Sequence, residues 1–249
     1  MTAPFPSRKQ EDWRYADLDA LRPVWDQLAE PLTFTVGAGE SLEEVWLPSR
    51  DDVQVRRATI ALGDGAKARL FVLNNSGIYG RTELEVSLEV DSDFELYVAN
   101  IGSGSSTNEL VTKVNHIGER GRSRQIVRSV LGDKAVGSYL GKVEVARGAQ
   151  QTDGEQSVKA MLLDRGATAN CKPELEIYAD DVKCAHGASV GELDETQLFY
   201  AMSRGLDPAS ARALLLEGFV MGLWDHVTDD AQREAICTAA RESLRRVSK

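Results

Sequence analysis

The chain has 249 residues, 42% hydrophobic and 27% charged, a composition typical of a globular protein of one large or two small domains. Its formal net charge of −10 argues against non-specific binding to nucleic acid and to anionic membrane surfaces, because both need a basic field. No apolar run approaches the roughly 20 residues of a membrane-spanning helix, and the N-terminus lacks a signal-peptide pattern. Three cysteines (Cys171, Cys184 and Cys237) are too few for a disulfide scaffold, so we expect a reducing, cytoplasmic setting.

Prolines and tryptophans are concentrated at the start of the chain. The first fifty residues hold five of the seven prolines and three of the four tryptophans. Proline lacks the backbone N–H that a strand or a helix interior requires. We therefore expect residues 1–50 to form a short helical or irregular N-terminal segment.

The middle of the chain, residues 51–190, has the pattern of many short strands. Apolar residues alternate with polar ones over residues 82–90 and again over 94–98, the period of a half-buried strand. Turn dipeptides recur at spacings of 27, 29 and 27 residues: Asp64-Gly65, Asp91-Ser92, Arg120-Gly121 and Arg147-Gly148. A period in the twenties is typical of a stacked β-solenoid. A sandwich of meandering strands explains the same periodicity equally well.

Residues 191–249 change to a helical pattern. Asp194 and Gln197 resemble a capping box at the start of a helix. Arg204-Gly205 indicates that this helix ends there, and Asp207-Pro208 supplies an N-cap and a first-turn proline for the next. We therefore expect a C-terminal helical domain.

Two glycine-rich segments invite a nucleotide-binding interpretation. Residues 137–143 resemble a phosphate-binding loop, but they have one residue too few between the glycines and Val143 where a metal-binding hydroxyl belongs. Residues 102–106 lack the third glycine of a dinucleotide fingerprint. We expect both segments to be turns, with no nucleotide site. A serine hydrolase is also disfavoured, because no GxSxG motif occurs and neither His116 nor His226 lies in a motif.

Cys184 and His186 are the residues most suited to metal chemistry. They are two positions apart, so in an extended segment both side chains lie on one face. Without a CxxC pair, a complete four-ligand site within this chain is disfavoured. One interpretation is a buried structural cysteine beside a hydrogen-bonded histidine, and the other is a site shared across a subunit interface.

Four segments carry a family resemblance. The run KPELEIYADDVKCAHGASVG at residues 172–191 resembles the signature of the SufB/SufD family of iron–sulfur cluster assembly proteins, and residues 193–205 and 211–219 resemble its continuation. Residues 8–15, RKQEDWRY, resemble the N-terminal motif of the SufD branch of the family. The resemblance implies a right-handed parallel β-helix core followed by a C-terminal helical domain.

The resemblance also implies a function. The family's SufD-type member is a non-enzymatic subunit that pairs with SufB through the β-helix and docks on the ATPase SufC through its helices. His186, with the neighbouring Cys184, matches the family's interfacial residues, where iron or a nascent cluster is held transiently and no cofactor is bound stably. We expect Leu214, Leu215 and Phe219 to contact SufC, because the segment 208–224 is more apolar than one packing face requires. The isolated chain is expected to form a homodimer through its unpaired edge.

Two alternatives belong to other functional classes. A β-helical carbohydrate-active enzyme would need a carboxylate-lined groove and measurable lyase or hydrolase activity. A purely structural β-solenoid adaptor would bind partners without taking part in metal chemistry.

Overall fold

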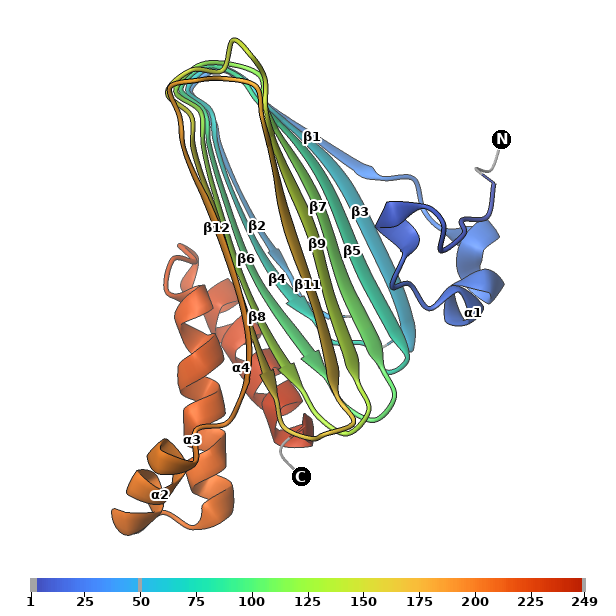
Figure 1. Cartoon of the computed structure of the whole chain (residues 1–249), viewed down its shortest axis with the longest axis vertical. Helices are drawn as coiled ribbons and strands as arrows, with labels where there is room; N and C mark the ends of the chain where they lie inside the picture. Colours follow the sequence, from blue (N-terminus) through green and yellow to red (C-terminus); the bar gives the residue numbers. More distant parts are fainter. Residues whose placement is uncertain (1–3, 49–50, 248–249) are drawn as a thin grey trace.

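A computed structural model describes residues 4–48 and 51–247. Two six-stranded parallel sheets form the body of the molecule (Figure 1). In spatial order, sheet A contains β1 (Leu32–Val36), β3 (Val53–Leu62), β5 (Tyr79–Leu88), β7 (Thr107–His116), β9 (Val136–Val145) and β11 (Thr168–Ile177). Sheet B contains β2 (Ser41–Trp46), β4 (Lys67–Asn74), β6 (Asp93–Gly102), β8 (Arg122–Leu131), β10 (Asp153–Leu162) and β12 (Lys183–Glu192). Each strand from β1 to β10 pairs with the strand two places further along the chain, so the fold is a parallel β-solenoid and not a meandering sandwich.

The turns that lead from sheet A to sheet B stack on one another. In the first five of these six turns, one residue has positive φ, between 56° and 71°, and donates its backbone N–H to a carbonyl of the next coil. These residues are Gly39, Gly65, Asp91, Arg120 and Gln151. The four turn dipeptides expected from the spacing fall in these connections, which confirms the repeat.

The inward faces of the two sheets form one apolar core. Side chains alternate inward and outward along each strand. In β5, for example, Leu84, Val86 and Leu88 are buried, as the alternation over residues 82–90 predicts. The core continues through every coil from Val36 to Val158.

Most of the C-terminal helices cover the outer face of sheet B, whereas the first of them packs on the second (Figure 1). They are α2 (Glu195–Ser203), α3 (Pro208–Val220), the 3-10 helix η3 (Met221–Trp224) and α4 (Asp230–Val247). Trp224 is fully buried in a second core that includes Phe71 of β4 and Tyr97 of β6. The predicted N-caps are confirmed, since Asp194 and Asp207 each accept two backbone N–H bonds at the start of a helix.

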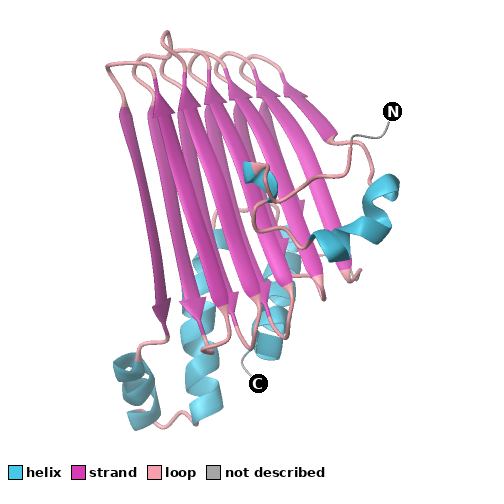
Figure 2. Cartoon of the chain, turned by 45° about the vertical axis from the view of Figure 1, so that its right-hand side comes forward, coloured by secondary structure: helices cyan, strands magenta, loops and turns pink. Residues whose placement is uncertain are grey.

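The N-terminal segment lies on the outer face of sheet A (Figure 2). It contains η1 (Glu11–Trp13), α1 (Leu18–Leu21) and η2 (Arg22–Gln27). The irregular region is shorter than expected, because β1 and β2 already form the first coil within residues 32–46. β1 (LTFTV) alternates fully but is only five residues long, and β2 (SLEEVW) is six residues long and does not alternate, so neither gives a strong strand signal. Residues 1–3, 49 and 50 of the expected segment lie outside the described residues.

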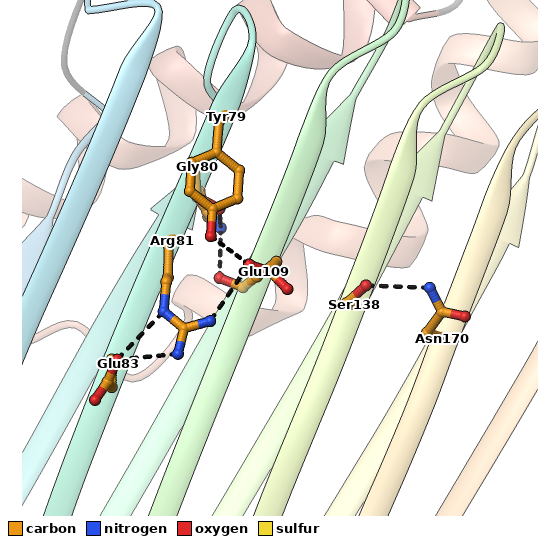
Figure 3. Close-up of polar contacts among 8 residues, drawn as sticks. Tyr79, Gly80, Arg81, Glu83, Glu109, Ser138 and Asn170 are labelled. Atoms are coloured by element: carbon orange, nitrogen blue, oxygen red, sulfur yellow. Dashed lines mark hydrogen bonds and ion pairs between the residues drawn. The ribbon is translucent and has the colours of Figure 1, made fainter. Parts of the chain in front are cut away.

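A buried polar cluster joins the N-terminal segment to sheet A (Figure 3). The Tyr79 hydroxyl donates to Glu109 at 2.5 Å, and the Arg81 guanidinium contacts Glu109 at 3.3 Å and Glu83 at 3.0 Å. Arg81 and Glu109 are fully buried, and the ring of Trp13 covers the guanidinium. This cluster places the residue 8–15 motif against the solenoid.

Candidate interface site at the open end of the solenoid

The last coil leaves an open end. Within the described residues, β12 pairs only with β10 and β11 only with β9. Nine of the ten residues of β12 are exposed, whereas the inward residues of β10 are buried. Such a strand edge presents unpaired backbone groups and is a template for pairing with another chain.

Cys184 and His186 both face the interior of this last coil. Their register partners on β10 are Gly154 and Gln156, which are inward-facing and buried. Because no further coil lies above β12 in the described chain, inward-facing residues of β12 are reached from the open end. His186 lines a shallow groove of about 370 Å³ together with Gln156 and Ala188.

The two side chains differ in exposure. His186 is exposed, whereas Cys184 is half-buried and contacts the apolar core. Burial raises the pKa of the Cys184 thiol, which keeps it protonated at neutral pH. Gly154 leaves room for the thiol, since a Cβ there would lie 3.3 Å from Sγ. The imidazole is therefore the more accessible potential ligand.

Cys171, on the opposite strand β11, is also half-buried at this end, and burial raises its thiol pKa. Among residues 4–48 and 51–247, no three His, Cys, Asp or Glu side chains are grouped closely enough to hold a metal ion. Cys184 and His186 thus supply two potential ligands, an incomplete set by the usual standard of three or four.

Sequence reasoning missed a polar column below His186. Gln125 and Gln156 occupy successive inward positions on β8 and β10 and are fully buried in an otherwise apolar core. They bond to Tyr139 and Thr112. Glutamine at an inward position of an alternating strand is the signal that could have identified this column.

The helical residues proposed for partner contact separate in the structure. Leu214 is 57% exposed and Leu215 is half-buried, but Phe219 contacts the core between the helices and sheet B, with Arg128 over its ring. Sequence reasoning missed the neighbouring exposed apolar residues Phe199, Tyr200, Met202 and Leu206. With Leu214 these form the α2–α3 surface.

No described helix is long and apolar enough to cross a membrane.

A carboxylate-lined groove of about 540 Å³ lies on the outer face of sheet A, as the carbohydrate-active alternative would need. Its carboxylates lie beside lysines: Lys142 binds Glu176 at 2.7 Å, and Lys113 lies 3.8 Å from Glu85. The hydrogen bond from Lys142 lowers the pKa of Glu176, whereas a catalytic general acid needs a raised pKa. The groove therefore does not favour glycoside chemistry.

Comparison with known proteins identifies the family. Residues 37–219 match the SufBD core domain of the SUF system for FeS cluster assembly. The chain belongs to this family. The family resemblance seen in the sequence is thus confirmed, together with the parallel solenoid it implied.

Several relatives carry the name SufD. The iron–sulfur cluster assembly protein SufD of Escherichia coli (strain K12) is 37% identical over 122 residues, 49% of this chain and 29% of that protein. Protein ABCI7, chloroplastic, of Arabidopsis thaliana is 38% identical over 152 residues, 60% of this chain and 32% of that protein. The SufD protein of Bacillus subtilis (strain 168) is 30% identical over 158 residues, 64% of this chain and 33% of that protein. The matched region spans about a third of the length of these relatives.

Proposed function

We propose that this chain is a non-catalytic SufD-type subunit of an iron–sulfur cluster assembly scaffold. In this proposal its last coil pairs with SufB, His186 and Cys184 face the shared interface, and the α2–α3 surface docks on the ATPase SufC. The observation that carries the proposal is the placement of an imidazole and a thiol on the inward face of an unpaired edge strand.

The site suits transfer of a metal cargo better than permanent binding. Two potential ligands leave coordination positions for a partner's residues, so a bound iron or nascent cluster would be shared between subunits. A neutral imidazole is a good ligand at physiological pH, and its exposure on β12 leaves it accessible to a partner. The half-buried thiol of Cys184 becomes a ligand only after losing its proton, which a nearby metal ion promotes.

The α2–α3 surface supports the second contact. Phe199 and Tyr200 are 69% and 60% exposed on a helix whose only buried residue is Ala201. Exposed aromatic side chains are enriched at protein–protein interfaces. Its helix α2 follows the edge strand β12 after two residues and lies beyond the end of that strand (Figure 1).

Substitution of His186 tests the proposal. In a reconstituted complex with SufB and SufC, His186→Ala should fold, bind both partners and fail to support cluster formation, measured by the visible absorbance of the assembled cluster. Val190→Ala, on the same strand and the same face, is the matched control and should support assembly. Cys184→Ser should have a milder defect, because the thiol is partly buried and protonated. Full assembly by a folded His186→Ala protein would remove His186 from the mechanism.

A further inference from the structure

A column of inward-facing polar side chains leads directly to His186. The register aligns Gln125 of β8, Gln156 of β10 and His186 of β12. Neighbouring strands are about 4.8 Å apart, and aligned residues of parallel strands project their side chains to the same side. Gln156 is therefore the immediate inner neighbour of His186, and both line the groove at the open end.

Hydrogen bonds inside the solenoid fix the orientation of the Gln156 amide. The Tyr139 hydroxyl donates to Gln125 Oε1 at 3.2 Å, so its oxygen is left to accept from Gln156 Nε2 at 2.8 Å. Burial raises the pKa of Tyr139 to about 12, so the phenol keeps its proton at neutral pH. Gln156 Oε1 is buried and has no hydrogen-bond partner among the described residues. The amide thus retains an acceptor that it has not used.

Gly141 makes this arrangement possible. A Cβ at Gly141 would overlap the phenol group of Tyr139, so any other residue would exclude the ring from its place in the interior. Gly141 belongs to the segment 137–143 that resembles a phosphate-binding loop, and this segment is part of β9. Its glycine pattern serves interior packing and, through Tyr139, the orientation of Gln156.

We propose that Gln156 is a positioning residue for His186: the two are not bonded in this structure, and a rotation of the exposed imidazole lets its N–H donate to the free Oε1 and directs the other ring nitrogen, with its lone pair, toward the open end. This inference rests on the proposed function, in which that nitrogen binds a metal cargo. A metal-binding histidine commonly donates its second ring N–H to a carbonyl or carboxylate, which fixes tautomer and orientation. The bond also gives a partner to a buried carbonyl that is otherwise unsatisfied.

The tautomer of His186 tests this arrangement in the full-length chain. Two-bond proton–nitrogen NMR spectra, recorded at a pH at which the imidazole is neutral, distinguish the two tautomers of each of the three histidines, and His186→Ala assigns the signal. We expect one tautomer to predominate at His186 in the unmodified chain. In Gln156→Leu we expect the tautomer ratio of a histidine in a short unstructured peptide. Val190→Ala, on the same face of β12, is the matched control and should keep the unmodified tautomer, because it leaves the bonds among Gln125, Tyr139 and Gln156 intact.

The inference would be overturned if His186 in the unmodified chain had the tautomer ratio of a histidine in an unstructured peptide. It would also be overturned if folded Gln156→Leu kept the tautomer of the unmodified chain. The first measurement needs no substitution, so the test stands even if Gln156→Leu does not fold. Cluster formation supplies a second measurement: loss of such a positioning bond typically weakens metal binding 10–100-fold, so Gln156→Leu should slow assembly by about tenfold or more. A tautomer change in Gln156→Leu combined with full assembly by His186→Ala would refute the proposed function alone. It would leave the bond between Gln156 and His186 standing.

Discussion

The guanidinium carbon of Arg81 lies 3.8 Å from the centre of the Trp13 ring. Trp13 belongs to the N-terminal segment and Arg81 to β5, so this contact holds the segment against the outer face of sheet A. The same guanidinium pairs with Glu109 in an environment from which water is excluded (Figure 3). Removing one partner of such a pair is costly, because the other charge stays buried without compensation.

We predict that Arg81→Met lowers the free energy of unfolding by about 3–5 kcal/mol, the usual cost of breaking a buried ion pair. Urea denaturation measures this loss. Trypsin should also cut earlier at Arg14, because the N-terminal segment loses its anchor. Arg120→Met is the matched control: Arg120 forms a two-point ion pair with Asp91, but on the surface, and its loss should leave the unfolding midpoint near the unmodified value. Equal losses from both substitutions would show that burial does not set the energy of the Arg81 pair.

Acid should destabilise the chain through His116. This histidine is fully buried, bonds to Ser123 at 2.8 Å, and has its pKa lowered by burial to about 4. An unfolded histidine has a pKa of about 6.5, so the unfolded chain binds the extra proton between these values. The contribution of neutral His116 to the free energy of unfolding is therefore complete above pH 6.5 and is lost as the pH falls toward 4.

In urea titrations, we expect the unmodified chain to lose about 2–3 kcal/mol more than His116→Asn between pH 7 and pH 4.5, from the linkage of one proton to unfolding. The comparison with His116→Asn removes the contribution of the carboxylates, which both proteins share. Parallel pH profiles of the two proteins would contradict the assignment.

Much of the architecture could be predicted from local chemistry. Asp194 and Asp207 predict helix starts because a side-chain acceptor satisfies free backbone N–H groups, and the structure confirms both. The alternation over residues 82–90 and the recurring turns indicate strands and their repeat. Periodicity could not separate a solenoid from a sandwich, because the choice depends on pairing between strands some thirty residues apart.

The failures also have physical causes. Residues 137–143 were expected to be a turn because of their glycines, but Gly137 and Gly141 lie in β9 and make room for interior side chains. The expectation that Phe219 contacts SufC stays a prediction: the ring is half-buried against the sheet B core, a placement that sequence spacing does not specify. The position of His186 on an inward face follows only once the register with Gln156 is known.

We predict that Gly141→Ala is destabilising by about 1–3 kcal/mol, the typical cost of overpacking a well-filled core. The added methyl group would overlap the ring of Tyr139, which has no free space to move into. Gly187→Ala is the matched control, since Gly187 also lies in a strand but has nothing within 4 Å of the added carbon. Thermal or urea unfolding measures both. Tolerance of Gly141→Ala would mean that Tyr139 occupies another position.

Substitutions at one proposed interface should weaken binding there and leave binding at the other interface unchanged. Phe199→Glu and Leu214→Glu place a charge on the α2–α3 surface, where both residues are more than half exposed, so folding should be unaffected. We expect each to weaken SufC binding by at least tenfold, the effect of losing a central apolar contact. Val190→Glu charges the inward face of the edge strand β12 and is the reciprocal control. It should weaken pairing with SufB, and self-association in sedimentation experiments, while leaving SufC binding intact. Loss of SufC binding in Val190→Glu, or its retention in both helix variants, would contradict the assignment of SufC to the α2–α3 surface.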